Sequence, residues 1–114
     1  MQHLVCFDMD RVLVDHMSTW QYVYDRLGIS NEEAFNLYNQ GKLDEWDWLK
    51  MDLALVKGAY PEINDEKMRE LCEGTPLMQG MKECLQWIID EGHEVAIISG
   101  GMQETATEIA CMFP

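Results

Sequence analysis

Basic residues are scarce in this sequence. Eight lysines and arginines stand against 21 aspartates and glutamates, and the formal net charge is -13. A chain with this charge is repelled by phosphate backbones and by anionic membrane surfaces, so neither nucleic acid nor a membrane is expected as a partner. Long apolar runs are also lacking: the longest toward the C-terminus is residues 95–98, and no basic segment leads into an apolar run at the start. The sequence therefore predicts a cytoplasmic protein without a membrane-spanning segment.

Cysteine is limited to four residues, and no two of them form a C-x-x-C pair. Zinc and a disulfide framework are therefore not indicated. Cys6 lies within an apolar strand pattern, where a small buried thiol is common, so we expect it to be buried. The 114 residues, of which 47% are hydrophobic, suffice for one domain with a modest core.

Two short apolar runs, residues 4–7 and 95–98, predict parallel strands that are buried on both faces. Ser30 and Glu33 form a capping-box pattern at the start of one helix between them. Apolar residues at helical spacing, with glycine and proline as breaks, predict helices at about residues 18–28, 30–41, 43–57, 64–74, 81–92 and 102–113. The predicted fold class is α/β: a parallel pair of strands joined by a right-handed crossover. The helical block of residues 18–73 is expected above the C-terminal edge of the sheet, where such folds bind ligands.

Two aspartates flank Met9 directly after the first predicted strand. In an extended chain, a spacing of two residues points Asp8 and Asp10 the same way. Such a pair can divide the work of phosphoryl transfer: one carboxylate attacks phosphorus, while the other protonates the leaving group and then activates water. Isolated Asp-x-Asp pairs are more often solvated loop acids. The apolar strand favours the functional interpretation here, because charges buried at its end need a metal or another partner.

Ser99, Gly100 and Gly101 follow the second predicted strand, just before a helix. A hydroxyl, exposed backbone N–H groups and the positive end of a helix together suit an anion such as phosphate. A tight strand-to-helix turn without a ligand explains the two glycines equally well. The combination with the aspartate pair is far more specific than either motif alone.

Residues 7–13, FDMDRVL, and residues 97–101, IISGG, resemble the first and second motifs of the haloacid dehalogenase superfamily, and within it the phosphoserine phosphatase-like branch. Residues 57–58 and 76–80 match as well, and the resemblance spans the whole chain. It implies a partial Rossmann-like α/β core formed by residues 1–14 and 76–114. Residues 15–75 would form an inserted small helical cap that closes over the substrate.

The resemblance implies a phosphatase that hydrolyses a small phosphorylated metabolite through an aspartyl-phosphate intermediate. Asp8 would be the nucleophile and Asp10 the general acid and base, while Ser99, Gly100 and Gly101 would bind the phosphate. Magnesium is the implied cofactor, and Asp8 and Asp10 would be its ligands.

Two further features bear on the substrate. Arg11 replaces the small residue often found after the second aspartate; as a phosphate ligand it would add positive charge, and the alternative is a place on the rim of the site. At the positions where phosphoserine phosphatases read the amino group and the carboxylate of their substrate, this sequence has Met17 and Asp52. A methionine and an aspartate cannot bind those two groups in that way, which argues against specificity for phosphoserine while leaving the resemblance to phosphatases intact.

Family members continue to a lysine that steadies the nucleophile and the phosphate, and then to aspartates that complete the magnesium site, whereas this sequence stops after the second motif. We therefore expect weak magnesium binding and little phosphatase activity from this chain alone. A two-stranded sheet is a poor core, so a second copy of the chain or a complementing C-terminal half is the expected partner. The alternative function is a catalytically inactive remnant that serves as a phosphate-binding or protein-interaction module. A third possibility is an artificial boundary or an interrupted reading frame, in which case the function belongs to a longer protein.

Overall fold

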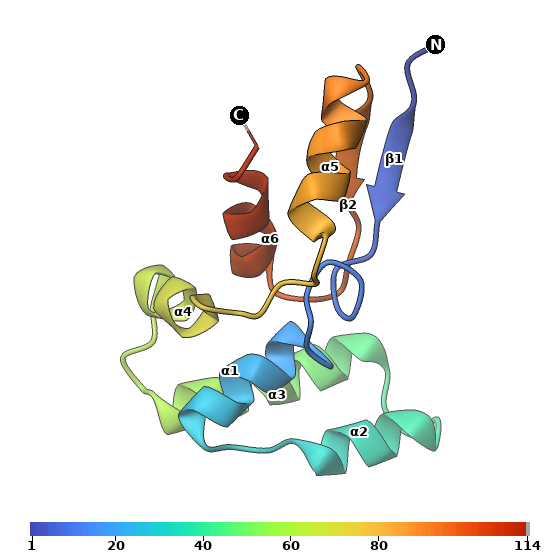
Figure 1. Ribbon diagram of the computed structural model, residues 1–114. Coiled ribbons are helices and arrows are strands. Elements are labelled where there is room, and N and C mark those ends of the chain that lie inside the picture. Colours follow the sequence, from blue (N-terminus) through green and yellow to red (C-terminus); the bar gives the residue numbers. More distant parts are fainter. Residues whose placement is uncertain (114) are drawn as a thin grey trace.

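The computed structural model of the protein describes residues 1–113 and shows a mixed α/β structure (Figure 1). The elements are, in chain order, β1 (Leu4–Phe7), α1 (Thr19–Leu27), α2 (Glu32–Asn39), α3 (Glu45–Ala59), α4 (Asp65–Cys72), α5 (Met81–Asp90), β2 (Glu94–Ile97) and α6 (Gln103–Ala110). The two strands are parallel neighbours, with a register that runs from Leu4 opposite Glu94 to Phe7 opposite Ile97. The predicted parallel pair of strands with intervening helices is confirmed. Pro114, the last residue of the predicted core, lies outside the described residues.

The strands are only half buried, so the prediction of burial on both faces is wrong. Side chains alternate along a strand, and in β1 the outward ones are Leu4, which is 61% exposed, and Cys6. Phe7 packs instead on the helical side, against a cluster that includes Leu85 of α5 and Ile109 of α6. Cys6 is exposed, contrary to expectation, because within residues 1–113 the helices pack against one face of the sheet.

The second strand is shifted by one residue from its predicted range. Glu94 begins it, because its N–H donates to the His3 carbonyl at 3.0 Å and extends the pairing toward the N-terminus. Ile98, predicted as part of the strand, follows the last paired residue and is 68% exposed. Its N–H still donates to the Phe7 carbonyl at 2.9 Å, so the chains stay together to this point.

Several helix ends differ from the predicted ones. The Ser18 cap of α1 is present, since the Ser18 hydroxyl accepts from the N–H groups of Trp20 and Gln21. The capping box at Ser30 is wrong: Asn31 occupies the cap position of α2. In α3, Gly58 lies inside the helix, which continues to Ala59, and α6 ends at Ala110 rather than at residue 113.

The helices α1 to α4 lie beyond the C-terminal ends of the strands (Figure 1). The chain leaves the sheet region and returns to it along adjacent segments. The Asp15 N–H donates to the Pro76 carbonyl, and the Met78 N–H to the Leu13 carbonyl, both at 2.8 Å. This crossing is where the predicted cap of residues 15–75 meets the predicted core of residues 1–14 and 76–114. The division into a core and a cap stays a prediction.

Two apolar clusters hold the chain together. One lies between the sheet, the turn after β1 and the helices α5 and α6, and its buried members are Met9, Leu13, Val14, Met81, Leu85 and Ile109. The other joins α1 and α4 to the start of α6, and its buried members are Val23, Leu71, Cys72 and Met102. Within residues 1–113, no helix combines the length and the apolar character that crossing a membrane requires.

Alkaline pH is expected to weaken the packing of α1 and α4. Burial raises the pKa of the Cys72 thiol above its ordinary value of 9.0. Burial, together with a hydrogen bond to the Asp52 carboxylate, raises the pKa of Tyr24 above its ordinary value of 10.0. The folded state holds both protons more tightly than the unfolded state does. The two protonated groups therefore contribute fully to the free energy of unfolding below their ordinary pKa values, and this contribution is lost as the pH rises past those values. We expect the free energy of unfolding, from urea titrations, to fall between pH 9 and pH 11.

The control is a Cys72→Ala, Tyr24→Phe double variant, which lacks both titrating groups. It is less stable at neutral pH, but its stability should change less between pH 9 and pH 11. An equally steep fall in both proteins would assign the alkaline transition to other groups.

Candidate active site at the ends of the strands

The two aspartates of the first motif follow the last residue of β1. Met9 between them is 1% exposed and packs in the core, whereas Asp8 is exposed and Asp10 is half-buried. Burial thus alternates from Asp8 through Met9 to Asp10, while the common direction of the two carboxylates stays a prediction. The Asp8 Oδ1 accepts a hydrogen bond from the Met9 N–H at 2.7 Å.

A tight turn follows Asp10. The N–H groups of Val12, Leu13 and Val14 all donate to the Met9 carbonyl, at 3.2, 2.9 and 2.9 Å. Arg11 takes a φ of 64°, a left-handed conformation that costs about 1 kcal/mol for a residue with a Cβ. Its side chain is exposed at the outside of the turn. This exposed position is compatible with Arg11 as a phosphate ligand and also with Arg11 as a residue on the rim of the site.

The turn after β2 packs against the turn after β1. A Cβ on Gly101 would lie 2.7 Å from Met9 Cε, 2.7 Å from Thr19 Oγ1 and 3.2 Å from Asp10 Oδ1. These distances are shorter than ordinary contacts of a Cβ, so only glycine fits at this position. The structure thus brings Gly101 of the second motif against Asp10 of the first.

The same turn presents polar groups to solvent. The Ser99 hydroxyl accepts from the Gly101 N–H at 3.0 Å, and both Ser99 and Gly100 are exposed. Among residues 1–113 the Gly100 N–H meets no acceptor at hydrogen-bond distance. The helix α6 begins directly afterwards, and its cap residue, Met102, provides no side-chain hydrogen bond to the first turn. Free N–H groups at such a helix start favour an anion.

Two residues that the sequence interpretation missed join these turns. Thr19 is 1% exposed; its N–H donates to Asp10 Oδ1 at 3.1 Å, and its Oγ1 accepts from the Met102 N–H at 2.8 Å. Trp20 donates from Nε1 to the Gly100 carbonyl at 3.3 Å. The only sequence signal for either was a place in the first turn of the helix after the aspartate pair. The start of α1 therefore contacts both motifs.

The predicted magnesium ligands form a partial donor set. Asp8 and Asp10 offer carboxylate oxygens, the ligand type that magnesium takes. One oxygen of Asp10 already accepts from Thr19. Within residues 1–113, no three histidine, cysteine, aspartate or glutamate side chains gather where they could hold a metal ion. The two carboxylates suit the ion, and water would have to supply most of the remaining ligands.

The resemblance relates Asp52 and Met17 to the substrate, and the two have different surroundings. Asp52 is 8% exposed, and its carboxylate accepts from the Tyr24 hydroxyl and, at 2.5 Å, from Asn31 Nδ2. This carboxylate serves the packing of the helices. Met17 is 71% exposed in the segment that leads to α1.

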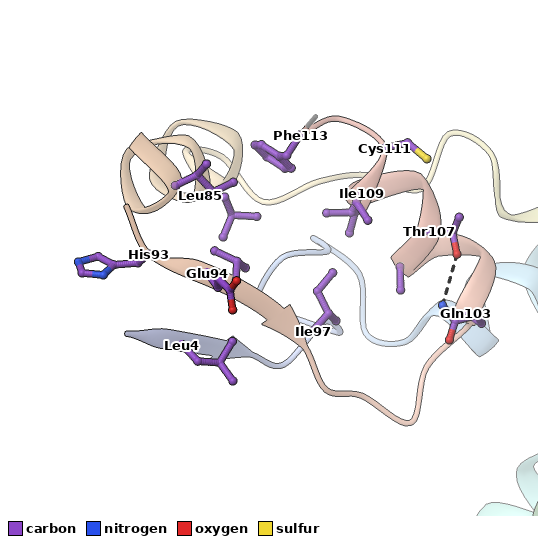
Figure 2. A pocket seen from close by; sticks show the side chains of 14 residues that line it. Leu4, Leu85, His93, Glu94, Ile97, Gln103, Thr107, Ile109, Cys111 and Phe113 are labelled. Atoms are coloured by element: carbon purple, nitrogen blue, oxygen red, sulfur yellow. Dashed lines mark hydrogen bonds between the residues drawn. The ribbon is translucent and has the colours of Figure 1, made fainter. Parts of the chain in front are cut away.

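A separate cavity lies away from these turns. It is an open groove of about 740 Å³ between α5, β2 and α6 (Figure 2). Leu85, Ile97, Ile109 and Phe113 are among its lining residues, and none of the predicted site residues is. A substrate site combines apolar walls with converging polar groups. The ends of the strands, with the polar side chains of Asp8, Asp10 and Ser99, meet the requirement for converging polar groups better than this groove does.

Comparison with known proteins identifies the family. A model of the haloacid dehalogenase-like hydrolases matches residues 5–113. The chain belongs to this family. The match covers both motifs and the helices between them, so the resemblance predicted from the sequence is confirmed.

The relatives include phosphoserine phosphatases. That of Wolinella succinogenes is 28% identical over 108 residues, which are 92% of this chain and 50% of the relative. A solved structure of a substrate-bound phosphoserine phosphatase complex gives a TM-score of 0.75 at 22% identity, over 98% of this chain and 52% of that one. A haloacid dehalogenase family hydrolase from Salmonella enterica serovar Typhi gives a TM-score of 0.77 at 20% identity, over 97% of this chain and 37% of that one. This chain thus resembles phosphoserine phosphatases, spans about half of their length, and has part of the haloacid dehalogenase fold.

Proposed function

We propose that this chain carries the nucleophile and the phosphate-binding turn of a magnesium-dependent hydrolase of small phosphomonoesters. The observation that supports the proposal most is the contact between the two motifs: Gly101 lies against Asp10, so the aspartate pair and the Ser99-Gly100 turn share one edge of the sheet. In open α/β folds this edge is the usual place for a ligand.

The chemistry divides between the two aspartates. An Asp8 carboxylate oxygen attacks phosphorus, the bond from phosphorus to the ester oxygen breaks, and Asp10 gives its proton to the departing oxygen. Asp10 then takes a proton from water, whose oxygen attacks the aspartyl-phosphate; inorganic phosphate leaves and the Asp8 carboxylate is restored. The exposed Ser99 hydroxyl and Gly100 N–H would hold phosphate oxygens, with Gly101 keeping the turn close to Asp10 and Arg11 adding charge from the rim.

Magnesium belongs to the same proposal. The family is typically magnesium-dependent. The Asp8 and Asp10 carboxylates would be the ligands from this chain, and the ion would supply positive charge that offsets the charge on the phosphate. Because these are only two carboxylates, we expect weak binding of the ion.

A partner would complete the site and the sheet. The chain spans about half of its phosphatase relatives, both strands of its sheet are edge strands, and Leu4 and Ile98 are large apolar side chains on exposed positions. Unpaired strand edges, together with exposed apolar side chains, favour pairing with another chain. A complementing C-terminal half or a second copy would fit these edges; native mass spectrometry distinguishes a homodimer from a monomer that awaits a different chain.

Replacing the proposed nucleophile tests the function. We expect slow release of p-nitrophenol from p-nitrophenyl phosphate by the chain with Mg²⁺, and release at the buffer level by an Asp8→Asn variant, because an amide cannot form the aspartyl-phosphate. Asp90→Asn is the matched control, since Asp90 is an exposed aspartate at the end of α5. It should keep the wild-type rate.

Two outcomes would count against the proposal in different ways. Turnover by the Asp8→Asn variant at the wild-type rate would exclude Asp8 as the nucleophile. Release at the buffer level by all three proteins would exclude hydrolysis by this chain alone. In that case a titration with inorganic phosphate, followed by ³¹P NMR, tests the alternative of a phosphate-binding module without catalysis.

A further inference from the structure

We infer that Thr19 is a positioning residue, which fixes the aspartate turn and the phosphate-binding turn relative to each other through the start of α1. The inference rests on the proposed function in that it assigns these two turns to one site. Thr19 itself is 1% exposed, so it acts through its neighbours rather than by touching a ligand.

The hydrogen bonds of Thr19 run in two directions. Its N–H donates to Asp10 Oδ1 at 3.1 Å, which orients the proposed general acid and base. Its Oγ1 accepts from the Met102 N–H at 2.8 Å, which holds the start of α6 directly after the glycines. Three segments that are distant in the sequence therefore meet at one threonine.

The neighbouring contacts leave Thr19 little freedom. The space beside its Oγ1 admits only the bare backbone of Gly101, since a Cβ there would come within 2.7 Å of that oxygen. Trp20, the next residue, donates to the Gly100 carbonyl at 3.3 Å and holds the same turn from a second point. In closely packed groups of this kind, a shift of one side chain also moves its neighbours. A change at the Thr19 hydroxyl should thus reach Gly100 and Gly101.

The hydroxyl can be removed with little change of shape. Thr19→Val deletes the acceptor and leaves the Met102 N–H buried without its partner. Thr19→Ser keeps the acceptor and lacks only a methyl group. Thr105→Val is the matched control, because Thr105 is also 1% exposed and lies in a helix. Its Oγ1 makes no hydrogen bond of ordinary geometry within residues 1–113, and the neighbouring Cys72 thiol is only a weak partner.

Two measurements on the complete chain test the inference. In ¹H–¹⁵N spectra, Thr19→Val should shift the amide signals of Gly100, Gly101 and Met102 and speed hydrogen exchange at Met102, whereas Thr19→Ser and Thr105→Val leave them near the wild-type positions. In a titration with inorganic phosphate and Mg²⁺, at a temperature where every variant is folded, Thr19→Val should raise the dissociation constant about tenfold, an effect of about 1.4 kcal/mol. Thr19→Ser should restore it to within about twofold of the wild type.

The outcomes separate this inference from the proposed function. Unchanged Gly100 and Gly101 signals in Thr19→Val would overturn the positioning role, whether or not phosphate binds. Thr19→Val and Thr105→Val with equal effects on the dissociation constant would also overturn it, because any buried threonine would then matter alike. If the wild type binds no phosphate, the proposed function fails, while the amide spectra still decide the role of Thr19.

Discussion

A Gly101→Ala variant is expected to lose about 3 kcal/mol of stability toward unfolding, together with most of its affinity for phosphate. The new methyl group would lie 2.7 Å from Met9 Cε and from Thr19 Oγ1. Met9 can swing its flexible end away, but Thr19 is held by hydrogen bonds on two sides. Thr19 must therefore shift and weaken its bond to the Met102 N–H, or the turn must open and move Gly100 away from the aspartates.

Gly100→Ala is a closely matched control, because a Cβ on Gly100 meets nothing within 4 Å. We expect its free energy of unfolding to stay within about 0.5 kcal/mol of the wild type, as for other open surface positions. Urea unfolding of both variants gives the comparison. Equal stability of the two would mean that the second motif does not pack tightly against the first, and the shared edge that supports the proposed function would be lost.

Local sequence patterns predicted where the two candidate motifs lie in the fold. An apolar run that ends in Asp-x-Asp, and another that ends in Ser-Gly-Gly, place both motifs at the ends of parallel strands by strand geometry alone. The helix predicted from about residue 18 begins at Thr19, with Ser18 as its cap. Before α2 the capping-box pattern pointed to Ser30, but the cap is Asn31, one residue later, since helix boundaries read from local patterns are uncertain by a residue or two.

The remaining features depend on contacts between distant segments. The exposure of Cys6 and Leu4 follows from which faces of the sheet are covered, and an apolar run does not reveal that. Thr19 is similar: one threonine after a helix cap is ordinary, and its role appears only when Asp10 and Met102 are placed beside it. Tertiary hydrogen bonds carry no local signature in the sequence, which is why the aspartate pair stood out as a candidate and Thr19 did not.

An Asp52→Leu variant is expected to lose about 3 kcal/mol of stability toward unfolding, because it removes an acceptor from two donors in the packed helices. Asp52 on α3 is 8% exposed and accepts from Tyr24 on α1 and from Asn31 before α2, so one carboxylate ties three helical segments together. Leucine fills a similar volume but accepts no hydrogen bond. The buried Tyr24 hydroxyl and the partly buried Asn31 amide would each remain without this partner, and each such group costs about 1–3 kcal/mol.

A double-mutant cycle isolates this interaction from the loss of packing. If the cost arises from the unpaired hydroxyl, Asp52→Leu should cost less in a Tyr24→Phe background, with a coupling of about 1 kcal/mol or more. Asp52→Asn, which keeps an acceptor oxygen, should lie between leucine and the wild type. Additive effects of Tyr24→Phe and Asp52→Leu in urea unfolding would mean that the carboxylate does not hold these helices together. Asp52 would then be free for another role, including contact with the substrate.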